Sequence, residues 1–157
     1  MTRIITTHVT ISAPTENVWE TLTDLDGYRT WNPFITAATG TINLGKRLQL
    51  TIQPPGGQAM TFRPWVTAVE PHHYIEWLGR LRLPGVFDGR HSFTLTPMTG
   101  GRTLIQQSET FTGLLIPVSG PTLARTRAGF VAMNQALAQQ TAWPVTRKTV
   151  SRPGTDP

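Results

Sequence analysis

The chain has 157 residues, a formal net charge of +5 and no cysteine. This length suffices for one domain with its own hydrophobic core, and the lack of cysteine excludes disulfides, thiolate metal sites and a cysteine nucleophile. The basic residues are dispersed along the sequence, whereas a nucleic-acid-binding protein usually gathers them on one face, so we interpret the charge as solubilising.

The chain begins with a predicted strand and two short helices. Residues Ile4 to Ile11 are rich in β-branched side chains, which favour strands. Ser12 is a candidate helix cap with Pro14 in the first turn, and Thr23-Asp24 resembles a second cap. The helical pattern fails before Pro33, so we expect a bent pair of short helices in this region.

Six further segments are predicted to be strands, because each is bounded by glycine or proline residues typical of turns. The segments are Phe34 to Leu44, Arg47 to Gln53, Ala59 to Val69, Tyr74 to Leu81, Phe87 to Thr96 and Arg102 to Phe111. Their short connections favour an antiparallel meander. Pro64 lies inside the third of these segments and cannot donate to a sheet, so we expect an edge or a bulge there.

The longest helical period in the chain runs from Gly120 to Trp143. Pro121 suits the first turn of a helix, and Pro144 disfavours helical geometry in the residue before it. One stripe of this helix, at steps of three and four, carries Leu123, Thr126, Phe130, Met133 and Leu137.

The order of elements predicts an α+β fold with a curved, seven-stranded antiparallel sheet. The sheet and the two short helices wrap around the long C-terminal helix within a single domain, residues 1–143. Residues 144–157 are basic and contain proline, and we expect a disordered tail there. A curved sheet that faces one helix tends to leave a cavity between the two layers, which is a usual place for a ligand.

Two residues on neighbouring strands are candidates for acid–base chemistry. His91 alternates with Phe93, so it points into the interior if Phe93 does. A hairpin centred near Thr99 would place His91 opposite roughly Gln107, with Glu109 one diagonal away. A carboxylate near an imidazole can set its tautomer, and such a pair can act as acid and base. Two alternatives stay open: His91 only forms a hydrogen bond to a neighbouring strand or to a buried water, and Glu109 is exposed near the end of its strand.

Aromatic side chains supply most of the other predicted ligand contacts. Trp31, Phe34 and Phe87 fall at loops or strand ends, where the entrance to a cavity forms, although core packing is the ordinary role of aromatic residues. The residues predicted to form the ligand cavity are Trp31, Phe34, Trp65, Trp77, Phe87, His91, Phe93, Phe111, Phe130, Met133 and Asn134.

No metal ion or cofactor is predicted. His72 and His73 are adjacent, so in a strand they point to opposite faces and cannot chelate a metal from one side. The sequence also lacks the spacing typical of a zinc protease, a phosphate-binding loop or a serine hydrolase.

A set of motifs follows one another in a fixed order between residues 2 and 142. They are Ile11-Ser12-Ala13-Pro14-x-x-x-Val18-Trp19-x-x-Leu22-x-Asp24, Tyr28-x-x-Trp31-Asn32-Pro33-Phe34, Gly45-x-x-Leu48, Phe87-Asp88-Gly89-x-His91-x-Phe93, Gly100-Gly101-x-Thr103, Glu109-x-Phe111-x-Gly113 and Phe130-x-x-Met133-Asn134-x-x-Leu137. As a set they resemble the SRPBCC or START-like superfamily, which includes the polyketide cyclase/dehydrase and lipid-transport families and the birch-pollen-allergen type of fold.

The resemblance implies a helix-grip fold with a hydrophobic tunnel, but it does not imply one reaction. Members of the superfamily bind lipids, sterols, polyketides or plant hormones; some cyclise a substrate, and others assist chaperones. A shared fold does not by itself determine function.

Three functional hypotheses therefore stay open. The leading one is binding of a small hydrophobic ligand, lipid-, polyketide- or aromatic-like, in the cavity. The second is a polyketide cyclase or dehydratase type of enzyme that uses His91 and Glu109 as acid and base. The third is a chaperone-helper or membrane-associated interaction protein, which requires an exposed apolar patch instead.

The expected partner is a small hydrophobic molecule, with no nucleic acid and no stable membrane insertion. No stretch reaches the roughly 20 apolar residues of a membrane span, and the N-terminus lacks the apolar run of a signal peptide. We therefore expect a cytoplasmic protein that is a monomer or a homodimer.

Overall fold

The computed structural model describes residues 1–80, 83–116 and 120–142. The elements in chain order are β1 (Thr2–Ile11), α1 (Thr15–Thr23), α2 (Tyr28–Trp31), β2 (Ile35–Thr39), β3 (Gln49–Ile52), β4 (Met60–Phe62), β5 (Trp65–Glu70), β6 (Tyr74–Arg80), β7 (Asp88–Met98), β8 (Arg102–Thr112) and α3 (Gly120–Thr141).

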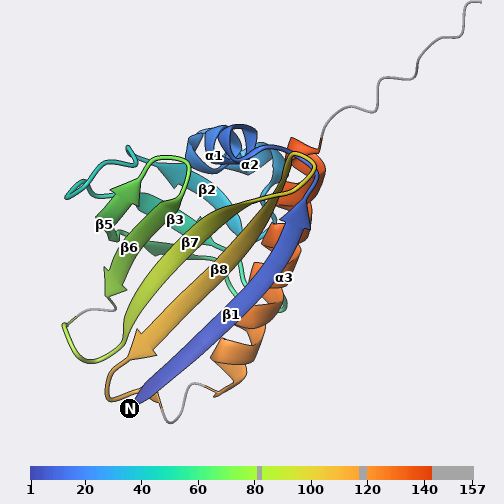
Figure 1. Cartoon of the computed structure of the whole chain (residues 1–157). Helices are drawn as coiled ribbons and strands as arrows, with labels where there is room; N and C mark the ends of the chain where they lie inside the picture. The colour runs from blue at the N-terminus through green and yellow to red at the C-terminus, as the bar shows by residue number, and fades with distance from the viewer. Residues whose placement is uncertain (81–82, 117–119, 143–157) are drawn as a thin grey trace, which may run out of the picture.

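The strands form two antiparallel sheets. The larger sheet has the order β1-β8-β7-β6-β5, and the smaller one has the order β2-β3-β4. Figure 1 shows α3 running along one face of the larger sheet, while α1 and α2 lie across one end of it. The prediction of an α+β fold, with a curved antiparallel sheet and a long C-terminal helix, is confirmed.

The predicted number of seven strands is wrong, because the described residues contain eight. The segment predicted from Ala59 to Val69 is divided at Pro64 into β4 and β5, which belong to different sheets. Pro64 has no N–H to donate, but its carbonyl accepts the N–H of Leu48 at 2.9 Å. The neighbouring residues Arg47 and Trp65 form an isolated antiparallel β-bridge, so the segment before β3 contacts the chain on both sides of its change of sheet. The chain therefore changes sheets at the proline, where we expected only an edge or a bulge.

The two short helices are present, but the first is capped differently from the prediction. Pro14, not Ser12, is the N-cap of α1, and it makes no side-chain capping hydrogen bond. Before α2, a carboxylate oxygen of Asp24 accepts the N–H of Gly27 at 3.2 Å, so Asp24 stabilises the turn between the helices.

Helix α3 has the predicted start and the predicted buried stripe. Phe130, Met133 and Leu137 are fully buried, and Leu123 and Thr126 are half-buried. Residue 143 and the predicted tail of residues 144–157 lie outside the described residues.

The helix meets the segment before β2 at Gly129. A Cβ added at Gly129 would collide with the ring of Phe34. The same ring packs edge-on against Phe130, with 5.6 Å between the ring centroids. Because closely packed interiors leave little free space, the missing side chain at Gly129 is what allows the Phe34 ring to lie against α3.

We expect the Gly129→Ala substitution to lower the free energy of unfolding by about 1–3 kcal/mol. The cost of overpacking against Phe34 should exceed the gain of about 1 kcal/mol from the higher helix propensity of alanine. Urea denaturation measures the change. Combining Gly129→Ala with Phe34→Leu is the matched control, and it should recover part of the loss. An unchanged or raised denaturation midpoint for Gly129→Ala alone would contradict this account of the contact.

Candidate functional site

A cavity of about 390 Å³ lies between the two sheets and the N-terminal half of α3. Small-molecule sites commonly measure about 300–1,000 Å³ and are mostly apolar. The side chains and backbone that line it belong to Phe34, Ile52, Pro54, Met60, Phe62, Pro64, Trp77, Gly79, Arg80, Phe87, Gly89, Glu109, Phe111, Leu115, Thr122 and Thr126. Glu109 is the acidic residue in this mainly apolar wall.

Part of the predicted cavity set lines this space. Phe34, Trp77, Phe87 and Phe111 are wall residues, as is Glu109 from the predicted acid–base pair. The rings of Phe87 and Phe111 also contact each other, with centroids 5.5 Å apart. These residues come from two loops and from strands β6 and β8, so the fold brings together positions that are far apart in the sequence.

The other predicted residues lie elsewhere. Phe93, Phe130, Met133 and Asn134 are buried in the core, where α3 closes against the sheet beyond the end of the cavity. His91 lies with them, and its surroundings are described below. Alternation along a strand predicts which face a residue lies on, but not how far along the strand the helix separates from the sheet.

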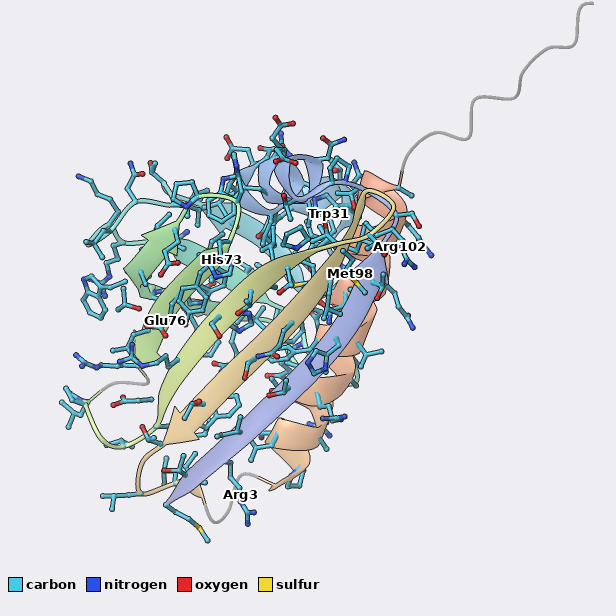
Figure 2. The ribbon with its side chains drawn as sticks, viewed as in Figure 1. Arg3, Trp31, His73, Glu76, Met98 and Arg102 are labelled. Atoms are coloured by element: carbon cyan, nitrogen blue, oxygen red, sulfur yellow. The ribbon has the colours of Figure 1, made fainter. Side chains whose placement is uncertain are left out.

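The two remaining tryptophans lie away from the cavity wall. Trp65 is 38% exposed, and the guanidinium of Arg47 lies 4.3 Å above its ring. Trp31 packs edge-on against Tyr28. Figure 2 shows Trp31 beside the short helices, at the opposite end of the molecule from Arg3. The cross-strand partner of Arg3 is the wall residue Phe111, so the cavity lies toward the Arg3 end of the sheet and away from Trp31.

The pairing of β6, β7 and β8 places Trp77, His91 and Glu109 in one row across the sheet. Glu109 is thus directly opposite His91, whereas the sequence predicted Gln107 there. The predicted register is wrong by two residues. The hairpin is centred on Gly100 instead of Thr99, because Gly100 and Gly101 both adopt positive φ values, 77° and 65°, in the loop.

His91 lies directly behind the cavity wall. Its ring stacks parallel on the wall residue Trp77, with centroids 4.9 Å apart and an interplanar angle of 3°. Phe93 and Phe130 contact its other sides, at 4.8 and 4.9 Å between centroids. The residue is only 4% exposed, so Glu109 is the member of the pair that reaches the cavity.

The hydrogen bonds of His91 select one tautomer. The amide nitrogen Nε2 of Gln107 lies 3.3 Å from Nε2 of His91, and Nδ1 of His91 lies 3.4 Å from Oε2 of Glu109. An amide nitrogen can only donate, so Nε2 of His91 accepts and Nδ1 carries the hydrogen. Nδ1 then donates to Glu109. The ring therefore orients the carboxylate from behind, and the carboxylate faces the cavity as a hydrogen-bond acceptor or a base.

Glu76 on β6 is held outside this site. Its carboxylate accepts hydrogen bonds from Thr67, Tyr74 and Arg90 on the outer face of the sheet, and Figure 2 shows where it lies on β6. Burial alone raises the pKa of Glu76, but these three hydrogen bonds together lower that pKa below its ordinary value. Glu76 therefore faces away from the side of β6 on which Trp77 lines the cavity.

Most of the wall was not predicted from the sequence: Ile52, Pro54, Met60, Phe62, Pro64, Gly79, Arg80, Gly89, Leu115, Thr122 and Thr126. Gly79 and Gly89 line the cavity. Strand alternation places them on the same face as Trp77 and His91, so the sequence contained the signal that could have identified them. The side chain of Asn32 accepts the N–H groups of Phe34 and Ile35, at 3.0 and 2.8 Å. It therefore holds the loop that carries Phe34 into the wall.

Exposed leucines lie beside the cavity. Leu115 lines it and is 43% exposed, and Leu114 is 83% exposed. The backbone N–H groups of Leu114 and Leu115 donate to the carbonyls of Gly85 and Val86, so two loops are joined at this rim. Within the residues that the structure describes, no helix is both long and apolar enough to cross a membrane.

Solved structures of other proteins share this fold. The Zhui aromatase/cyclase from Streptomyces sp. R1128 is 20% identical and aligns with a TM-score of 0.70, over 90% of this chain and 94% of that one. A START superfamily protein from Mycobacterium smegmatis is 21% identical, with a TM-score of 0.68 over 88% and 96% of the two chains.

A more distant structural neighbour is norcoclaurine synthase from Thalictrum flavum. It is 15% identical and aligns with a TM-score of 0.69, over 89% of this chain and 86% of that one. At these identities the likeness shows the fold alone. A search of curated protein sequences found no significant match.

The sequence itself matches one family model. The model is described as polyketide cyclase / dehydrase and lipid transport, and it covers residues 2–142. This range includes every described helix and strand. The START-like resemblance predicted from the motifs is confirmed, and the chain belongs to the polyketide cyclase/dehydrase and lipid-transport family.

Proposed function

We propose that the protein binds a small hydrophobic ligand, lipid-, polyketide- or aromatic-like, in the cavity between the sheets and α3. The observation that carries the proposal is the wall itself, a mainly aromatic and aliphatic lining in which Glu109 and Arg80 are the charged residues. An apolar ligand would gain roughly 25 cal/mol for each Å² of apolar surface removed from water. Glu109 would supply the directional contact that orients it.

The family and the structural neighbours support this proposal. The family description joins polyketide chemistry with lipid transport, and both involve hydrophobic small molecules. The structure of norcoclaurine synthase is described in complex with dopamine and hydroxybenzaldehyde, two small ring compounds. The ligand of the present protein would then be a molecule of comparable chemistry, enclosed mainly by apolar contacts.

An enzymatic role is the second candidate, and the contact between His91 and Glu109 favours it. In this role the Glu109 carboxylate takes a proton from the bound substrate or returns one to it. His91 would be a positioning residue, because it lies behind Glu109 and donates its Nδ1 hydrogen to the carboxylate. This assignment differs from an equal acid–base pair, in which both side chains would reach the substrate.

We expect the Thr126→Phe substitution to block the cavity without disturbing the fold. Thr126 lines the cavity from α3, and its hydroxyl donates only to the carbonyl of Thr122 in the same helix. Calorimetric titration with dodecanoic acid and with naphthol tests an acyl chain and a ring compound. We expect the wild-type chain to bind at least one probe, and the variant to bind it at least about tenfold more weakly, which corresponds to about 1.4 kcal/mol.

Ala128→Phe is the matched control, because Ala128 is an exposed position on the same helix and does not line the cavity. This control should bind like the wild-type chain. Equal binding by wild type and Thr126→Phe, or binding of neither probe by the wild-type chain, would refute the proposed function.

NMR spectra of the imidazole nitrogens test the arrangement behind Glu109. We expect neutral His91 to carry its hydrogen on Nδ1, and the preference to be lost in Gln107→Leu. His8 is an internal comparison, because its Nε2 lies 3.1 Å from the amide oxygen of Gln106 and must donate to it. The finding of an Nε2 hydrogen on His91 would rule out the proposed orientation of Glu109.

A further inference from the structure

The cavity depends on one cross-strand row on the inner face of the sheet in which two of three positions are glycine. Trp77, His91 and Glu109 fill one row with three large side chains. The next row, closer to the N-terminal end of β7, consists of Gly79, Gly89 and Phe111, all of which line the cavity. Two of its three positions present only backbone, so β6 and β7 contribute no side chain of their own to this row.

The backbone conformation does not require glycine at either position. Neither Gly79 nor Gly89 is among the glycines with positive φ, so other residues could adopt both conformations. Glycine inside a strand weakens it and commonly marks a place where a ligand or another chain segment approaches closely. We therefore attribute the two glycines to the space above the strand, which a side chain would fill, and not to the backbone conformation.

The two glycines differ in what a side chain would meet. A Cβ added at Gly89 would collide with Oε1 of Glu109, so the carboxylate occupies the space above Gly89. A Cβ added at Gly79 would lie 3.9 Å from its nearest neighbours, the carbonyl oxygen of Gly89 and Cβ of Pro64. A Cβ at Gly79 would thus fit without a clash, and a larger side chain there would extend toward the cavity that Gly79 lines.

We propose that Gly79 and Gly89 determine which ligands the cavity accepts. Gly79 presents uncovered backbone against which a planar ring lies. Gly89 leaves room for the Glu109 carboxylate beside Gly79, where the carboxylate accepts a hydrogen bond from a hydroxyl or N–H group on the ring. This inference rests on the proposed binding function of the same cavity.

The ligand class follows from the shape and chemistry of this part of the wall. A planar ring matches the uncovered backbone at Gly79, and Phe87 and Phe111 stand beside it to contact the ring edges. The free side of a carboxylate can only accept hydrogen bonds when it is ionised. We therefore expect a ring compound with a donor group to bind more tightly than a flexible acyl chain or a ring without a donor.

Titration with three probes tests the inference: naphthol, its methyl ether and dodecanoic acid. In the wild-type chain, naphthol should bind at least about tenfold more tightly than the ether, since the ether cannot donate to Glu109. Glu109→Leu should remove this difference. Gly79→Val should weaken both naphthyl probes at least about tenfold and leave the urea midpoint unchanged or raised, because β-branched residues favour strands.

Leu78→Val is the matched control for Gly79→Val, because Leu78 is the adjacent residue on the opposite face of β6 and does not line the cavity. It should bind all probes like the wild-type chain. Unchanged naphthol binding by Gly79→Val, or equal binding of naphthol and its ether by the wild-type chain, would overturn the inference.

The test also separates this inference from the proposed function. Binding of dodecanoic acid but neither naphthyl probe by the wild-type chain would overturn the role of the glycine pair and leave the binding function standing. Binding of none of the three probes would overturn both.

Discussion

The hydrogen-bond register of β6, β7 and β8 is the constraint on which the site depends. It places Trp77, His91 and Glu109 in one row and Gly79, Gly89 and Phe111 in the next. A shift of the pairing by two residues would separate Glu109 from His91, and a shift by one residue would turn the inner face outward. The stack of Trp77 on His91, the orientation of Glu109 and the place of the two glycines in the cavity wall are therefore consequences of a single register.

The second half of the site is the helix that faces these rows. Contact between Gly129 and the Phe34 ring holds α3 close to the loop before β2. Farther toward its N-terminus the helix presents Thr122 and Thr126, which are small, and the cavity lies between them and the glycine floor, which Gly79 and Gly89 form. Where α3 presents Phe130 and Met133, the interior is filled instead. The cavity thus occupies the part of the interface where both layers carry small residues.

Much of this architecture could be predicted from the sequence. The periods of the strands and of α3 indicated the fold, and alternation correctly placed His91 on the inner face with Phe93. Sequence reasoning failed where the result depended on the conformation of a loop, or on where along the strands the helix separates from the sheet. Two left-handed glycines moved the centre of the β7–β8 hairpin and changed the partner of His91. Pro64 moved the chain from one sheet to another. Phe93 and Met133 share a face with cavity residues but lie where the helix and the sheet are packed together. A pattern of faces contains no information about where along an element the two layers separate.

We expect a ligand to lie on the glycine floor of the cavity, beside Glu109. The most direct measurement is the change in the backbone amide NMR signals when naphthol is added to the wild-type protein. We expect the signals of Gly79, Gly89 and Glu109 to shift together as the probe saturates, while those of Gly100 and Gly101, in the β7–β8 loop at the other end of these strands, remain unchanged. Saturable shifts confined to residues outside the cavity wall, with no change at Gly79 and Gly89, would contradict the account.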